Sequence, residues 1–305
     1  MREVGPRDGL QMAKTIMPTE AKRDWIAALV AAGINEIEVG SFVPPKAMPQ
    51  MADVPQLTAD VRRLHPGIGI VSLVPNLRGA MAAIDAGADI LLVPVSASQA
   101  HSQANVKRTR EQQVEEVRRI AAYIATLGGR APRLETGLST AFGCSLQGYV
   151  PEADVLTLAV ALLEAGADTI ALADTLGYAT PTQVRSLVRE VRSEIGAERF
   201  GKLHLHDTMG MALANVLAGL EEGVRGFDSA LGGLGGCPFA PGSVGNVSTE
   251  DLVYLLESEG FDTGIDLDAL IAARAILHQG LPDEPLHGRV AAAGVPRTYR
   301  AFARP

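Results

Sequence analysis

Two histidines stand one residue apart in an apolar stretch, in the run Leu203-His204-Leu205-His206-Asp207. Side chains two positions apart in a β-strand point to the same side, so both imidazoles would face one space. Metal ligands use this spacing, and it also suits two hydrogen-bonded histidines in a protein core. A carboxylate from another strand end would decide between these two interpretations.

Two oxygen-bearing residues elsewhere in the chain are candidates to complete such a metal site. Asp8 lies in Arg7-Asp8-Gly9, after the first apolar stretch, and Asn246 lies at the end of a glycine-rich loop. A carboxylate, an amide oxygen and two imidazoles form a mixed set of ligands, which suits a divalent ion such as Mg, Mn, Co or Zn. We therefore predict a metal site formed by Asp8, His204, His206 and Asn246. An exposed ion pair of Arg7 with Asp8 is the alternative for that segment.

Two further acids lie in or directly after apolar stretches. Glu38 stands inside Ile37-Glu38-Val39, where a buried carboxylate without a partner would be costly. It therefore requires a cation or a proton, and both a structural ion pair and a proton relay satisfy that requirement. Asp174 follows an apolar run and opens Asp174-Thr175-Leu176-Gly177. It is a candidate for chemistry, and it is equally compatible with capping the next helix.

A glycine-rich loop, residues 232–246, carries one thiol, Cys237. Alone, it indicates a turn with a buried cysteine, because free cysteines are more often small core residues than reactive ones. Beside the polar residues above, it becomes a candidate lid that brings Asn246 and Cys237 to one site. Cys144 is the chain's other cysteine, and two cysteines do not suggest a disulfide framework.

The elements that must position these residues alternate in a regular way. Eight short apolar stretches are each followed by a helix candidate, centred near residues 26, 58, 81, 118, 158, 188, 216 and 254. The predicted strands are Arg2 to Gly5, Glu36 to Gly40, Ile68 to Val74, Asp89 to Val95, Arg133 to Ser139, Thr169 to Ala173, Lys202 to His206 and Gly226 to Ala230. Eight such units predict an α/β fold, a TIM (β/α)8 barrel. A doubly wound sheet is the alternative, and it is disfavoured because no G-x-G-x-x-G turn follows the first strand.

The predicted organisation is a catalytic barrel over residues 1–264 and a short C-terminal helical appendage over residues 265–305. The appendage contains one helix, Leu267 to about His278, and a tail interrupted by proline and glycine. In a (β/α)8 barrel the active site lies at the carboxyl ends of the strands. The polar residues above follow strands, so the fold would bring them together.

Composition excludes several classes of partner. The 305 residues carry a formal net charge of −8, with basic residues spread along the chain, which argues against nucleic acid and anionic membranes. No apolar run approaches the roughly 20 residues that span a bilayer. We expect a cytoplasmic enzyme with a small-molecule substrate.

The motifs resemble those of the 3-hydroxy-3-methylglutaryl-CoA lyase family of divalent-metal barrels. They cover nearly the whole chain and comprise Glu3-Val4-Gly5-Pro6-Arg7-Asp8-Gly9-Leu10-Gln11, Ser41-Phe42-Val43 with Pro45-Lys46, Pro75-Asn76-Leu77, Asp174-Thr175-Leu176-Gly177, His204-Leu205-His206-Asp207, Gly232-Gly233-Leu234-Gly235-Gly236-Cys237-Pro238, and Asn246 to Thr249-Glu250-Asp251-Leu252. The most specific of them is the Gly-Leu-Gly-Gly-Cys-Pro phrase.

The resemblance implies a retro-Claisen cleavage of an acyl-CoA substrate, yielding acetyl-CoA and acetoacetate, as in leucine degradation and ketone-body formation. Mg or Mn would be held by Asp8, His204, His206 and Asn246. Arg7, Glu38, Asp174 and Cys237 would serve catalysis. The resemblance also implies a homo-oligomer, a dimer.

One segment departs from the family pattern. Where many members read Gly-Cys-Pro-Tyr after the fifth strand, this chain reads Gly143-Cys144-Ser145-Leu146. A related 3-hydroxyacyl-CoA of the longer-chain glutaryl or citramalyl type therefore stays open as the substrate. A barrel that binds a metal or acyl-CoA without catalysis is a further alternative.

Overall fold

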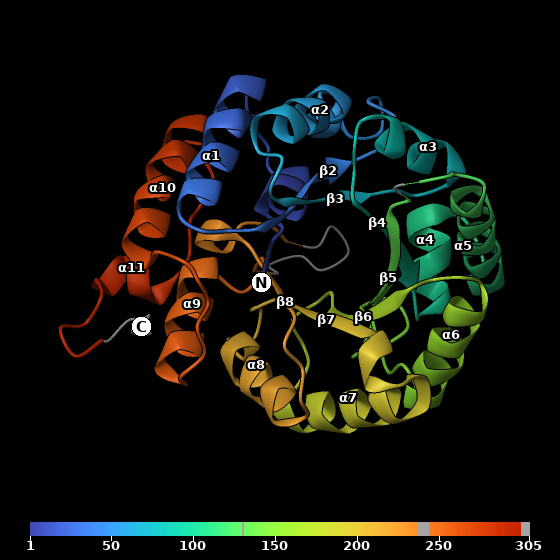
Figure 1. Ribbon diagram of the computed structural model, residues 1–305. Helices are drawn as coiled ribbons and strands as arrows, with labels where there is room; N and C mark the ends of the chain where they lie inside the picture. Colours follow the sequence, from blue (N-terminus) through green and yellow to red (C-terminus); the bar gives the residue numbers. More distant parts are fainter. Residues whose placement is uncertain (130, 237–243, 300–305) are drawn as a thin grey trace.

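Eight parallel strands form a closed barrel, hydrogen-bonded in chain order from β1 to β8 and back to β1. Helices surround the barrel on its outside (Figure 1). The computed structural model describes residues 1–129, 131–236 and 244–299. The closed barrel confirms the predicted (β/α)8 fold and rules out the doubly wound sheet, which has two open edges.

The observed elements follow the predicted alternation. The strands are β1 (Arg2–Glu3), β2 (Glu36–Ser41), β3 (Gly69–Leu73), β4 (Ile90–Ser96), β5 (Arg133–Ser139), β6 (Thr169–Asp174), β7 (Phe200–Leu205) and β8 (Phe227–Ser229). The barrel helices are α1 (Thr19–Ala31), α2 (Val54–Leu64), α3 (Leu77–Asp85), α4 (Gln99–Val106), α5 (Arg110–Ala125), α6 (Glu152–Glu164), α7 (Pro181–Ile195), α8 (Ala212–Glu221) and α9 (Thr249–Ser258). The eight predicted helices correspond to α1 to α3 and α5 to α9, and α4 was not predicted.

Two helices follow the barrel. α10 (Leu267–Gly280) packs against α1 and α9, and the short α11 (Arg289–Ala293) packs on α9. Figure 1 shows the three C-terminal helices side by side on the outside of the barrel. α10 was predicted, whereas α11 falls in the tail that we expected to be irregular.

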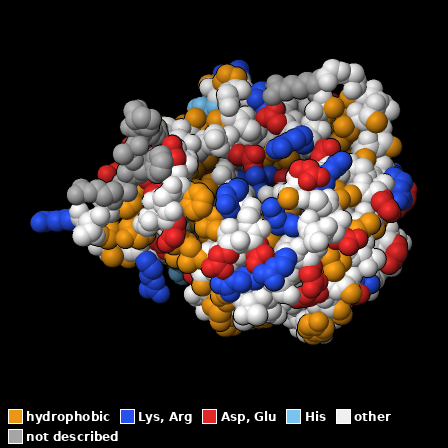
Figure 2. All heavy atoms as spheres, turned by 60° about the horizontal axis from the view of Figure 1, so that its bottom comes forward, with side chains coloured by type: hydrophobic (Ala, Val, Ile, Leu, Met, Phe, Trp, Pro, Cys, Tyr) orange, Lys and Arg blue, Asp and Glu red, His pale blue; other side chains and the backbone are white. Residues whose placement is uncertain are grey.

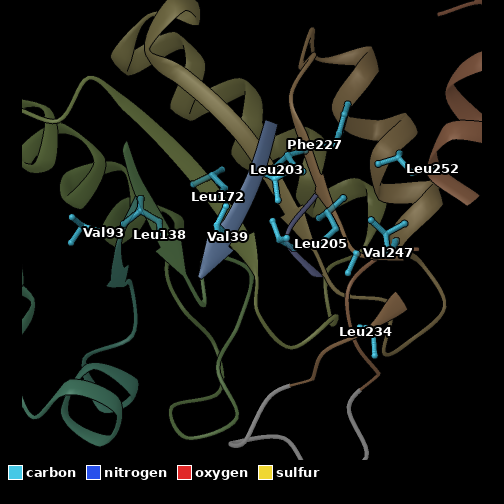
Figure 3. Close-up of a cluster of buried hydrophobic side chains, with 14 of the residues drawn as sticks. Val39, Val93, Leu138, Leu172, Leu203, Leu205, Phe227, Leu234, Val247 and Leu252 are labelled. Carbon is cyan, nitrogen blue, oxygen red and sulfur yellow. The ribbon is translucent and has the colours of Figure 1, made fainter. Parts of the chain in front are cut away.

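Alternation along the strands separates core from cavity. Leu203 and Leu205 belong to the buried hydrophobic core between strands and helices, and Figure 3 shows them among other strand residues of that core. His204 and His206 face the other side and line a cavity inside the barrel mouth. The period of two predicted for this strand is therefore confirmed.

Charged residues fill part of the barrel interior. Arg2 is fully buried and makes a bidentate ion pair with Glu135, at 2.7 and 2.9 Å, and a 2.9 Å contact with Glu36. Lys202 pairs with Glu36 at 3.1 Å. Burying a charge is tolerated when it is paired and hydrogen-bonded, and each charge of this network has an opposite partner.

The first strand is shorter than predicted. β1 has two residues, which pair with β2 on one side and with β8 on the other and so close the barrel. Gly5, predicted as its end, instead begins a π-helical turn, Gly5–Gly9. The Val4 carbonyl accepts hydrogen bonds from the amides of Arg7 and Asp8, at 3.0 and 2.7 Å. This turn places Arg7 and Asp8 at the mouth of the barrel.

Glu3 joins three segments around this turn. Its buried carboxylate accepts hydrogen bonds from the amides of Gly5 and Leu231, both at 2.9 Å, and from the Thr249 hydroxyl at 2.6 Å. Burial raises the pKa of Glu3 from 4.5 to about 7, although these three hydrogen bonds favour its charged form. The first turn, the entry to the glycine-rich loop and the start of α9 thus depend on one acid.

Glu3 is expected to make the protein less stable as the pH rises from about 4.5 to 7. A folded-state pKa above the unfolded value stabilises the protein below pH 4.5, and this contribution is lost as the pH rises through 7. Replacing Glu3 with glutamine removes the titration. The free energy of unfolding of the variant minus that of the wild type should therefore increase by about 3 kcal/mol between pH 4.5 and 8. Urea unfolding at several pH values measures this. Parallel curves for the two proteins would contradict it.

Charges are mixed on the outer surface. Arg185 on α7 pairs with Glu221 at the end of α8, and Arg189 on α7 pairs with Glu222, the residue after α8. Figure 2 shows basic and acidic side chains interspersed over one face of the molecule. In the part of the chain that the structure describes, no helix combines the length and apolar character needed to cross a membrane.

Candidate active site

A cavity of about 520 Å³ opens at the carboxyl ends of the strands. Its wall includes Ser41 at the end of β2, Ser139 at the end of β5 and Thr175 directly after β6. Four predicted site residues also line it: Arg7, Asp8, His204 and His206. Both its position and its size are typical of the ligand site of a (β/α)8 enzyme.

Three candidate metal ligands converge in this cavity. Asp8 Oδ2 lies 3.3 Å from His206 Nε2 and 3.8 Å from His204 Nε2, and the two ring nitrogens are 3.1 Å apart. Among the described residues, these are the histidines, cysteines and acids that could jointly hold a metal ion. Burial opposes the ionisation of Asp8, yet the charge of Arg7 and a hydrogen bond with His206 hold its pKa well below the usual range. Asp8 is therefore an anion, as a carboxylate that binds a metal must be.

Asn246, the fourth predicted ligand, lies beside this cluster. A β-bridge pairs it with His206, and its Nδ2 donates to Asp8 Oδ2 at 2.7 Å and to the Leu234 carbonyl at 3.0 Å. Its Oδ1 is buried and has no hydrogen-bond partner among the described residues. An unpaired buried acceptor typically costs about 1–3 kcal/mol, and a cation would provide a partner for it. The donor set and this unpaired oxygen fit a hard divalent ion.

Arg7 is held at the cavity wall by two carboxylates. Its Nε lies 2.8 Å from Glu38 Oε1, and its Nη1 donates to Asp8 Oδ1. Burial raises the pKa of Glu38, and the charge of Arg7 opposes that rise. Glu38 is fully buried and is not among the residues that line the cavity. Of the two interpretations left open for Glu38, the geometry favours an ion pair that positions Arg7.

Asp174 is placed behind the cavity wall. Its carboxylate accepts hydrogen bonds from the amides of Tyr178 and Ala179, both at 3.0 Å, in the loop between β6 and α7. The N-cap of α7 is Thr180, so Asp174 does not cap that helix. Burial raises the pKa of Asp174, and these amides oppose the shift. Cys237, the remaining predicted residue, lies outside the described residues.

Asp228 was missed in the sequence. It stands in the middle of β8 and lines the cavity, and its Oδ2 lies 3.2 Å from His204 Nδ1. A carboxylate inside a short predicted strand is the same signal that indicated Glu38, so Asp228 could have been a candidate, whereas its contact with His204 depends on strand register.

His101 also lines the cavity, from the unpredicted helix α4. It is buried, and its Nδ1 lies 2.8 Å from the Ser96 hydroxyl at the end of β4. Ser98 caps α4 by accepting the His101 amide at 3.2 Å. This helix is short and only weakly amphipathic, so the sequence shows no clear helical period for it.

Comparison with known proteins decides the family of this site. The model of the HMGL-like family matches residues 1–277. The chain belongs to the HMGL-like family. This confirms the resemblance to 3-hydroxy-3-methylglutaryl-CoA lyases found in the motifs.

Several HMGL-like relatives match over most of their length. A 3-hydroxy-3-isohexenylglutaryl-CoA/hydroxymethylglutaryl-CoA lyase of Pseudomonas aeruginosa is 40% identical, over 89% of each chain. An (R)-citramalyl-CoA lyase of Chloroflexus aurantiacus is 40% identical, over 96% of this chain and 93% of its own. The structure of an HMG-CoA lyase from Acinetobacter baumannii, in complex with coenzyme A and 3-methylmalate, is 42% identical with a TM-score of 0.90, over 99% of this chain and 97% of its own.

The segment that departs from the HMGL-like pattern does not face the cavity. Residues 143–148 are not among the lining residues. Cys144 is buried, and its Sγ accepts the amides of Leu146 and Gln147, both at 3.4 Å, inside a tight turn. The loss of the Pro-Tyr pair therefore gives no direct reason to expect a different acyl pocket.

Proposed function

We propose that this chain is a divalent-metal-dependent lyase that cleaves 3-hydroxy-3-methylglutaryl-CoA into acetyl-CoA and acetoacetate. The observation that carries the proposal is the cluster of Asp8, His204 and His206 beside Arg7 in one cavity. The relative solved with coenzyme A supports an acyl-CoA substrate. Mg or Mn as the metal and a homodimer belong to the same proposal and rest on the sequence resemblance, and a cytoplasmic location, which rests on composition, belongs to it as well.

The reaction requires three changes in the substrate. The C3 hydroxyl loses its proton, the C2–C3 bond breaks with its electron pair passing to C2, and the resulting thioester enolate gains a proton at C2. A divalent cation held by Asp8, His204, His206 and Asn246 would act as a Lewis acid that favours the deprotonated hydroxyl. Asp8 is already ionised for that task.

Arg7 would stabilise the negative charge that develops on oxygen. Its guanidinium lines the cavity and is fixed by Glu38 and Asp8, so little reorganisation is needed when the charge forms. Glu38 and Asp174 do not line the cavity, and we propose that they act through their neighbours. Glu38 would hold Arg7, and Asp174 would hold the amides of the β6–α7 loop.

We propose Cys237 as the proton donor to the enolate. The proposal rests on the thiol in the Gly-Leu-Gly-Gly-Cys-Pro phrase and on the resemblance. The loop that carries it begins at η4 (Leu231–Gly233), directly beside the Glu3 carboxylate, and returns to the site at Asn246.

A second candidate function is cleavage of a related thioester. Relatives that are equally identical to this chain are named for isohexenylglutaryl-CoA and for citramalyl-CoA, so overall identity does not separate these substrates. Pocket contacts appear in kcat/KM as differences in transition-state binding.

A panel of thioesters tests the choice. The purified protein with Mg²⁺ or Mn²⁺ is given 3-hydroxy-3-methylglutaryl-CoA, citramalyl-CoA and 3-hydroxy-3-isohexenylglutaryl-CoA in turn. We expect the highest kcat/KM for the first, with acetoacetate as product. A higher kcat/KM for either of the others would favour the second candidate. Tight metal binding without turnover of any thioester would favour a non-catalytic barrel.

A further inference from the structure

His204 is the one cluster histidine whose second ring nitrogen meets a carboxylate. Its Nε2 faces the cluster, 3.1 Å from His206 Nε2, and its Nδ1 lies 3.2 Å from Asp228 Oδ2. The corresponding Nδ1 of His206 is buried and has no hydrogen-bond partner among the described residues. The two histidines are therefore held in different ways.

A carboxylate beside Nδ1 selects one form of the imidazole. A neutral imidazole has one proton, and a carboxylate accepts it as a hydrogen bond, so the proton resides on Nδ1. Nε2 then presents its lone pair to the cluster that contains Asp8 and His206. With the proton on Nε2 instead, His204 could not bind a metal through that atom.

The barrel register places Asp228 in this position. Asp228 is the register partner of His204 on β7 and of Arg2 on β1, so three neighbouring strands present these residues at one level. Arg2 Nε lies 3.9 Å from Asp228 Oδ1, and Arg2 is itself held by Glu135 and Glu36. The buried ion pairs thus support Asp228 from the side opposite His204.

We propose that Asp228 is a positioning residue, which holds His204 in the tautomer and orientation that bind the metal, and that Arg2 supports Asp228 in this role. The inference rests on the metal site of the proposed function. It gives a role to Arg2 and Asp228 in the barrel interior, which have no role in the proposed reaction.

Metal affinity of the full chain tests the inference without any thioester. Protein stripped of metal with a chelator is titrated with Co²⁺ by calorimetry, and the visible spectrum of bound Co²⁺ reports its ligand geometry. Asp228→Asn should weaken Co²⁺ binding about 10- to 100-fold and alter that spectrum. The matched control is Asp53→Asn, which makes the same chemical change at a part-buried carboxylate that pairs with Lys22 and does not line the cavity. It should bind Co²⁺ nearly as the wild type does.

Three results would overturn the inference. Co²⁺ binding by folded Asp228→Asn with wild-type affinity and spectrum would show that His204 needs no support. An equal loss of affinity in Asp53→Asn would show that the effect is one of overall charge. Failure of the wild type to bind Co²⁺ would refute the metal site itself, and with it the proposed function, whereas the first two results leave the proposed function intact. Thermal melting of the metal-free proteins checks folding, and Asp228→Ser, which is smaller and uncharged, replaces Asp228→Asn if that variant does not fold.

Discussion

Replacing Asp8 with asparagine is expected to lower both the affinity for Mn²⁺ and kcat/KM for 3-hydroxy-3-methylglutaryl-CoA by more than about 100-fold. Removing a residue that only supports a metal ligand typically lowers metal affinity or activity by about 10- to 100-fold. Asp8 is itself a proposed ligand, so a larger loss is expected. It also supplies the one formal negative charge of the cluster with His204 and His206. The two measurements are calorimetry with the metal and steady-state kinetics with the thioester.

The Asp8 variant needs a control with the same chemical change. Asp24 lies exposed on α1, and Asp24→Asn should leave both quantities unchanged. Because the asparagine side chain does not ionise, raising the pH should not restore the activity of this variant. Metal affinity within a few-fold of the wild type would contradict the assignment of Asp8.

Replacing Arg7 with methionine is expected to reduce both activity and stability. Loss of a preorganised charge that stabilises an oxyanion typically costs about 10²- to 10³-fold in kcat. The change also removes the cation that lies 2.8 Å from the fully buried Glu38. Removing one partner of a buried ion pair costs about 3–5 kcal/mol. Urea unfolding and steady-state kinetics measure the two effects.

A second substitution separates these two effects. In the double variant Arg7→Met, Glu38→Gln the buried charge of Glu38 is removed as well, and Asp8 loses Arg7 but keeps its contacts with His206 and Asn246. Much of the stability should therefore return while the activity stays low. The stability loss of the single variant should also be larger at pH 8 than at pH 5. Burial raises the pKa of Glu38, and without Arg7 the carboxyl takes up a proton more readily at low pH. A double variant as unstable as the single one, or one that regains activity, would contradict the account.

The fold and most of the cluster of candidate metal ligands were predictable from local patterns. Apolar stretches of strand length alternate with helical segments, and several helices end at glycines with positive φ, between 81° and 101°, as the Ala-Gly and Glu-Gly pairs indicated: Gly33, Gly87, Gly166 and Gly223. The His-x-His spacing placed two candidate ligands on one side of a strand, and the barrel topology brought Asp8 and Asn246 to them.

The contacts and side-chain directions that depend on the register of neighbouring strands were not predictable. Asp228 meets His204 because two strands pair at that level, which no single segment encodes. β2 has an irregularity between Glu38 and Gly40 that turns Gly40 toward Val54 on α2, and Ser41 then lines the cavity. Strict alternation from Glu38 would have turned Gly40 toward the cavity instead. The π-helical turn after β1 likewise shows no distinct sequence period.

The central claim is a metal-dependent carbon–carbon cleavage, and its most direct test is product analysis with one substrate. Protein stripped of metal is mixed with 3-hydroxy-3-methylglutaryl-CoA, first with chelator and then with excess Mn²⁺, and acetyl-CoA and acetoacetate are both quantified. The account predicts no product with chelator and equal amounts of the two products with Mn²⁺. Cleavage that proceeds equally well with chelator, or no cleavage with bound Mn²⁺, would contradict it.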